Sequence, residues 1–167
     1  MKRSIEPTSR TRRTHGPHRS TMFKRYTFWL SAAILFQLLT AVIHTIGLFV
    51  RPEPTNETER ELVGLLKTYE LQAGMGFTPT YADLFTAMGA SFTFLLLFSA
   101  LINGYLLVKQ TEPNVMKGIL AINVAVFGVS FLTMAVFTFI TPIFFTGLIF
   151  LNLLVAYVMV PKIEITI

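Results

Sequence analysis

The chain of 167 residues is 53% apolar and only 14% charged, and its mean hydropathy is +0.60. This composition argues against an ordinary soluble domain and is typical of a membrane protein. The formal net charge is +5, but eight of the 14 lysines and arginines lie within residues 1–25, so the basic character belongs to one tail and does not indicate a nucleic-acid partner.

Residues 1–25 form a basic N-terminal tail rich in Arg, Ser and Thr, interrupted by Pro7 and by Gly16-Pro17. Because few apolar side chains are available for packing, we expect the tail to be disordered. Its role stays open between a solvated arm that orients the chain and a surface that binds anionic lipid. An organelle transit peptide is a third interpretation, although the prolines interrupt any amphipathic helix.

Four long runs without Asp, Glu, Lys or Arg follow the tail, at 26–50, 84–108, 118–140 and 141–160. A helix needs roughly 20 apolar residues to cross roughly 30 Å of hydrocarbon, so each run is long enough to span a membrane. The last two runs are contiguous, and Thr141-Pro142 supplies the break between them because proline fits the first turn of a new helix. We therefore predict an all-α, integral membrane four-helix bundle over residues 26–160, followed by a short tail, 161–167.

The basic residues predict the orientation of the bundle, since Lys and Arg near span ends stay on the cytoplasmic side. The N-terminal tail is basic, Lys109 and Lys117 bound the second loop, and Lys162 follows the last span. The first loop, 51–83, instead holds six acidic residues and three basic ones. We expect both termini inside, and the first loop outside.

The first loop contains an amphipathic helix, predicted over 57–73, with Leu62, Leu65, Leu66 and Tyr69 at helical spacing. Gly74-Met75-Gly76 is expected to end it. The helix either caps the bundle or lies on the membrane, or it docks a partner protein. Thr80 and Asp83 have the spacing of a helix capping box, so we interpret Asp83 as a cap rather than a catalytic group.

Several polar residues interrupt the apolar spans and are the candidate site residues. On the first span Gln37, Thr40 and His44 share one helical face with small residues, so this face is expected to contact protein. Asn103, Asn123 and Asn152 are expected to share one layer nearer the cytoplasmic ends of their spans. This layer either fixes the register of the helices or binds a polar ligand or ion. Ala121, Ala125 and Gly128 are expected to form a close-packing seam on the third span.

His44 is the one histidine within the first span. At its level we expect four hydroxyls and no carboxylate, which argues against a proton relay; the hydroxyls belong to Thr45, Ser91, Thr133 and Thr146. A neutral imidazole bonded to a hydroxyl or carbonyl is one interpretation, and a ligand contact in an outward-facing cavity is the other. A metal site is not expected, since the chain has no cysteine and only three histidines.

Three segments carry a family resemblance: "FWLSAAILFQLLTAVIHTIGLF", "TPTYADLFTAMGASFTFLLLF" and "FITPIFF". Over roughly 28–157 the chain resembles a group of small bacterial four-span proteins of unassigned activity, more distantly similar to DoxX-like proteins. The resemblance implies a four-span membrane fold and a bacterial inner membrane, and it brings no catalytic residue or cofactor.

No catalytic motif is present, such as His-Glu-x-x-His, a phosphate-binding loop or Gly-x-Ser-x-Gly. We therefore expect no enzyme, no cofactor and no metal. The first functional hypothesis is an accessory or scaffolding subunit that contacts membrane lipids and partner subunits or further copies of itself. The alternative is a binder or carrier of a small apolar ligand, a lipid or quinone, near His44 and an aromatic mouth made by Phe137, Phe139, Phe144 and Phe145.

Overall fold

The computed structural model describes residues 18–50 and 53–161, and side chains from Tyr26 onward. The described part is helical apart from turns and one short hairpin. Its helices are α1 (His18–Phe49), α2 (Glu57–Thr68), α3 (Tyr81–Val108), α4 (Pro113–Phe137) and α5 (Ile140–Met159).

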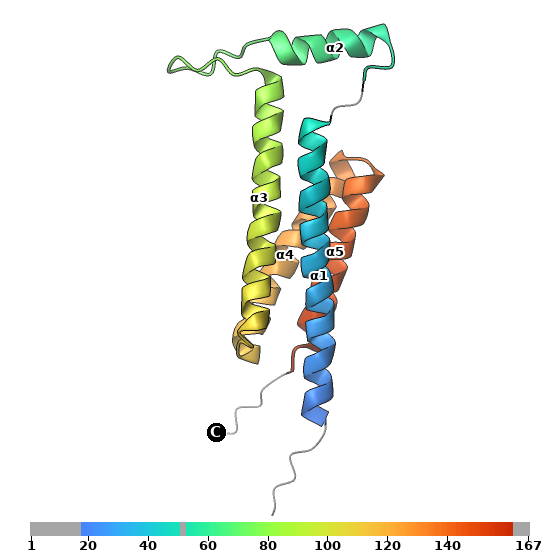
Figure 1. Ribbon diagram of the computed structural model, residues 1–167, viewed down its shortest axis with the longest axis vertical. Coiled ribbons are helices and arrows are strands. Elements are labelled where there is room, and N and C mark those ends of the chain that lie inside the picture. Colours follow the sequence, from blue (N-terminus) through green and yellow to red (C-terminus); the bar gives the residue numbers. More distant parts are fainter. Residues whose placement is uncertain (1–17, 51–52, 162–167) are drawn as a thin grey trace, which may run out of the picture.

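Figure 1 shows α1, α3, α4 and α5 running side by side, with α2 lying across one end of them. α1 packs along both α3 and α5, and α5 also packs along α4, whereas α3 and α4 are not a closely packed pair. The first turn of α1 and the last turn of α5 lie at the end opposite to α2 (Figure 1). We call these two ends the α2 end and the terminal end.

Four helices are long and apolar enough to cross a membrane: Tyr26–Phe49, Tyr81–Val108, Pro113–Phe137 and Ile140–Met159. Each has at least the length that the hydrocarbon layer requires. The predicted fold class, an all-α membrane bundle with one extramembrane amphipathic helix, is therefore confirmed.

The helices begin earlier than the uncharged runs predicted. α3 begins at Tyr81 because Thr80 and Asp83 form the expected capping box, in which each side chain accepts from the other residue's backbone N–H. α4 begins at Pro113, where proline fits the first helical position and no breaker follows. The turn between α4 and α5 lies at Thr138 and Phe139, three residues before the predicted junction at Thr141.

The amphipathic helix ends at Thr68, not at 73 as predicted. Beyond it the backbone is extended, Glu70 pairs with Thr80, and the Leu71 N–H donates to the Pro79 carbonyl at 2.9 Å. Gly74, Met75 and Gly76 all have positive φ and form the tip of this hairpin rather than the end of the helix. The cause is pairing with the chain before α3, which the local apolar spacing does not report.

Residues 18–25 of the predicted disordered tail belong to α1, which begins at His18. No proline or glycine lies between His18 and the first span, so the helix can extend beyond the apolar run. The rest of the tail, 1–17, and residues 162–167 lie outside the described residues.

The best-packed part of the bundle lies toward the terminal end. Its fully buried apolar side chains are Leu30, Leu96, Met116, Leu120, Ile149 and Leu153. α1 supplies one of these residues from its first half and α3 supplies one from its middle. α4 supplies two from its beginning and α5 two from its middle and second half, so all four spans meet there. Toward the α2 end, Phe137 and Phe139 are mostly exposed.

α4 and α5 interlock through two glycines and two aromatic rings. A Cβ added at Gly128 would lie 3.1 Å from the Phe150 ring, and one at Gly147 would lie 3.1 Å from the Phe131 ring. The two rings stack on each other, 6.1 Å between centroids. The small-residue seam predicted on this helix is therefore wrong for Ala121 and Ala125, which are exposed, and only Gly128 lies in a helix contact.

Candidate functional site: a polar network beside a membrane-facing groove

Four polar side chains from α1, α3 and α4 form one hydrogen-bond network in the bundle. Gln37 Nε2 donates to Ser99 Oγ at 2.9 Å, and Ser99 Oγ donates to Asn123 Oδ1 at 2.7 Å. Asn123 and Asn103 exchange longer bonds of 3.3 and 3.4 Å between their amides. This network, Gln37–Ser99–Asn103–Asn123, joins α3 to α4 where the two helices otherwise pack little.

One acceptor of the network has no partner. Gln37 is fully buried, and its Oε1 is the only fully buried side-chain N or O atom in the described residues without a hydrogen bond. Asn123 uses both amide atoms, since its Nδ2 also donates to the Ile119 carbonyl at 2.9 Å. A buried acceptor without a partner is costly, so this oxygen favours a donor from outside the described side chains.

Two predicted members do not join the network. Thr40 is buried, as expected of its face, but its hydroxyl donates to the Phe36 carbonyl of its own helix at 2.6 Å. Asn152 donates to the Leu148 carbonyl at 2.7 Å and makes no hydrogen bond to Asn103 or Asn123 in the described part of the chain. The expected layer of three asparagines therefore reduces to two, with Ser99 and Gln37 completing it.

His44 belongs to α1, and its imidazole ring faces α3. Its Nδ1 is 3.1 Å from Thr93 Oγ1, with the donor set by the imidazole tautomer, and its ring meets Phe92 edge-on at 5.2 Å between centroids. Gly89 allows this approach, because a Cβ there would lie 3.3 Å from His44 Cε1. The imidazole is thus bonded to a hydroxyl, as one of the two interpretations expects.

The hydroxyl is not one of the four that the sequence indicated. Each of those donates to a carbonyl of its own helix, such as Thr45 to Ala41 and Ser91 to Ala87. Thr93 and Ser99 were both missed. They lie six residues apart on α3, which is about 120° around the helix, so helical spacing alone does not place them on one face. Only the packing against α1 brings both hydroxyls into helix contacts.

A groove of about 350 Å³ separates α3 from α4 beside the network. It is lined by residues between 92 and 102 of α3 and between 119 and 130 of α4, all apolar except Ser99, Asn123 and Ser130. Leu95, Phe98 and Ile122 are more than 60% exposed, so the groove opens sideways where the bilayer would lie. Ser99 and Asn123 belong to both the groove and the network.

A second cavity, of about 720 Å³, lies under α2 and between the adjoining ends of α1 and α3. His44 lines neither cavity, although Leu48, one turn further along α1, lines this one. The four phenylalanines of the predicted aromatic mouth are also absent from the lining of both cavities.

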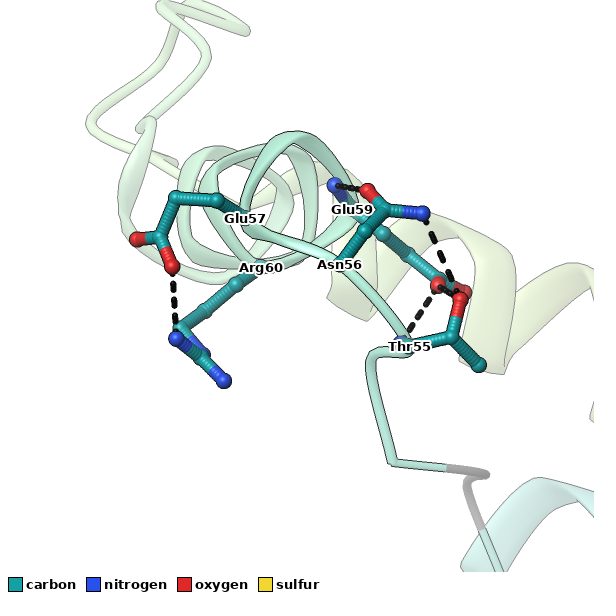
Figure 2. A network of polar contacts seen from close by, with 5 residues as sticks. All are labelled: Thr55, Asn56, Glu57, Glu59 and Arg60. Atoms are coloured by element: carbon teal, nitrogen blue, oxygen red, sulfur yellow. Dashed lines mark hydrogen bonds and ion pairs between the residues drawn. The ribbon is translucent and has the colours of Figure 1, made fainter.

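The beginning of α2 is held by a separate polar cluster, drawn in Figure 2. Glu59 Oε2 accepts from both the backbone N–H and the hydroxyl of Thr55 at 2.7 Å, and Asn56 Oδ1 accepts from the Glu59 N–H at 2.9 Å. Arg60 pairs with Glu57 at 2.6 Å. The bonds from Thr55 lower the pKa of Glu59, the backbone bond most. This cluster is a helix cap.

Comparison with protein families, with curated proteins and with solved structures finds no match to the chain. The resemblance to DoxX-like proteins stays a prediction. Among the described residues, no three His, Asp or Glu side chains gather where they could hold a metal ion.

Proposed function

We propose that this protein is a non-catalytic membrane protein that binds a lipid-like molecule in the groove between α3 and α4. The observation that carries the proposal is the position of the Gln37–Ser99–Asn103–Asn123 network, two members of which line that groove. The sequence placed the ligand of such a carrier beside His44. The proposal places it in this groove instead, because His44 lines neither cavity.

The groove suits the apolar part of such a ligand. Its volume of about 350 Å³ falls at the lower end of the range of ligand pockets, roughly 300 to 1,000 Å³. That size fits one chain or ring rather than another transmembrane helix. Because the groove opens sideways, a ligand can enter from the bilayer without crossing water.

The network favours a ligand that carries a hydrogen-bond donor. The acceptor oxygens that the groove presents to such a donor are those of Ser99, Asn123 and Ser130, whereas the fully buried Gln37 does not line the groove. A hydroxyl group on a lipid or a quinol supplies a donor, and a quinone carbonyl does not.

Filling the groove with a larger side chain tests this proposal. Val126 lines the groove and is 55% exposed, whereas Val129 lies on the same helix, is 65% exposed and does not line it. We expect Val126→Phe to lose the lipid-like molecule that co-purifies with wild type in mild detergent, and Val129→Phe to keep it. Mass spectrometry of the extracted molecules measures both.

Equal amounts of bound molecule in wild type and Val126→Phe would contradict the proposal. Asn123→Leu gives a second measurement, because it removes polar atoms from the groove without filling it. We expect this variant to retain apolar chains but to lose the preference for molecules with a hydroxyl group.

An accessory subunit is the second candidate, favoured by the exposure of α2. None of its residues is buried, and Leu62 and Leu65 are each more than half exposed. A partner protein that covers these leucines should co-purify with wild type and be lost in Leu62→Ser/Leu65→Ser. Glu61→Gln, on the same helix, is the matched control. Loss of the partner from the control as well would exclude a contact specific to the leucines.

The finer location also belongs to this proposal. The distribution of basic residues supports both termini in the cytoplasm and α2 outside, and the family resemblance supports a bacterial inner membrane.

A further inference from the structure

We propose that the cavity under α2 holds the headgroup of a zwitterionic phospholipid from the leaflet at the α2 end. This site is separate from the groove between α3 and α4 and does not depend on the proposed function. Its volume of about 720 Å³ is within the range of small-molecule pockets.

The lining of the cavity is apolar where the spans end and charged under α2. A membrane changes in the same order, from its hydrocarbon core to its headgroup layer. The ends of the two spans, α1 and α3, contribute Leu48, Ala82 and Phe85, which are apolar. The helix that lies across them, α2, contributes Glu59, Arg60 and Lys67. Figure 1 places α2 across the ends of the spans, which is the level of the lipid headgroups if the spans cross the bilayer.

The charges of the lining balance and leave one group of each sign available. Glu59 accepts hydrogen bonds from Thr55, and Arg60 pairs with Glu57. Glu53 and Lys67 also line the cavity, and neither makes an ion pair or a hydrogen bond with another described residue. A cation and an anion beside an apolar floor fit a phosphate, an ammonium group and the start of two acyl chains.

An anionic lipid fits this lining less well, since Glu53 and Glu59 both border the cavity. A soluble phosphate compound lacks the chains that would cover Leu48 and Phe85. Phosphatidylethanolamine therefore meets the lining best, with its phosphate toward Lys67 and its ammonium toward Glu53.

Lipid titration of the full chain tests the proposal. The delipidated protein in detergent is mixed with phosphatidylethanolamine or with phosphatidylglycerol of the same acyl chains, and bound lipid is counted by native mass spectrometry. We expect wild type to prefer phosphatidylethanolamine. Lys67→Gln should weaken the binding of both lipids, and Glu53→Gln should weaken the binding of phosphatidylethanolamine only. Each affinity should fall by about tenfold, as for a lost charge-assisted hydrogen bond.

Lys109→Gln is the matched control, because Lys109 lies at the terminal end over the Tyr105 ring. It should leave the lipid preference unchanged. Equal binding of the two lipids to wild type, or an unchanged preference in Glu53→Gln, would overturn the proposal. Displacement of the lipid by soluble glycerophosphoethanolamine at equal concentration would also overturn it, because the acyl chains would then contribute nothing.

Discussion

Hydroxyl groups in these spans have two kinds of partner, and the difference separates local from tertiary contacts. Thr40, Thr45 and Ser130 donate to the carbonyl four residues before them, which satisfies the hydroxyl within one helix. Thr93 and Ser99 instead bond side chains of other helices. These two hydroxyls set where α3 lies against α1 and α4.

A double-mutant cycle on His44 and Thr93 measures the contact between α1 and α3. Interhelical hydrogen bonds in membranes average about 0.6 kcal/mol, so we expect His44→Leu and Thr93→Val each to lower the unfolding free energy by about that amount. The double variant should lose little more than either single one, because both remove the same bond. Unfolding in detergent gives the three values, and full additivity would show that the bond contributes nothing.

His44→Gln separates a structural role of this residue from a ligand contact. An amide keeps a hydrogen bond to Thr93, so this variant should fold as wild type does and retain the same co-purifying molecule. A folded variant that has lost the molecule would place His44 in the ligand site.

At the scale of the elements, close packing of side chains holds α4 to α5, whereas hydrogen bonds hold α3 to α4. Gly128 and Gly147 each receive an aromatic ring of the opposite helix, so the two backbones approach closely. Between α3 and α4 the contact is a hydrogen-bond network with a groove beside it. We therefore expect the second pair to separate more easily than the first.

Two leucine substitutions on α4 test this packing. Gly128→Leu places a side chain where the Phe150 ring lies, and such overpacking costs about 1 to 3 kcal/mol. Ala125→Leu changes an exposed position and should stay within about 0.5 kcal/mol of wild type. Thermal unfolding in detergent ranks them. Greater damage from Ala125→Leu would mean that this face of α4 is an interface.

The pH dependence of α2 follows from Glu59. Because its folded pKa lies below the ordinary 4.5, its contribution is complete above that value and is lost as the pH falls through the lowered pKa. The side-chain NMR shift of Glu59 should titrate with a midpoint below the ordinary value in wild type. Thr55→Val removes one of the two hydrogen bonds to the carboxylate and should raise the midpoint; an unchanged midpoint would contradict the cap.

At the scale of the whole molecule, the sequence was sufficient where one residue type decides the outcome. Four runs without charge were enough to predict four spans, since hydrocarbon excludes charge from any helix that crosses it. The capping box at Thr80 and Asp83 also followed from spacing alone.

Contacts between helices were less predictable. The partner of His44 is Thr93 rather than Ser91, because the rotation of α3 about its axis depends on the fit of Gly89 against α1. Asn152 has the residue type but not the position to join Asn103. α2 ends at Thr68 because the hairpin pairs Glu70 with Thr80, a contact across ten residues that local periodicity does not contain.

Both proposed binding sites depend on the bundle crossing a bilayer with α2 on one side and the turn between α3 and α4 on the other. The chain has no cysteine, so single cysteines at Thr58 and Asn114, both exposed, can be labelled separately in intact cells with an impermeant maleimide. We predict labelling at Thr58 from outside, and at Asn114 only after the membrane is opened. Equal labelling of both positions from outside would contradict a bundle that spans the membrane.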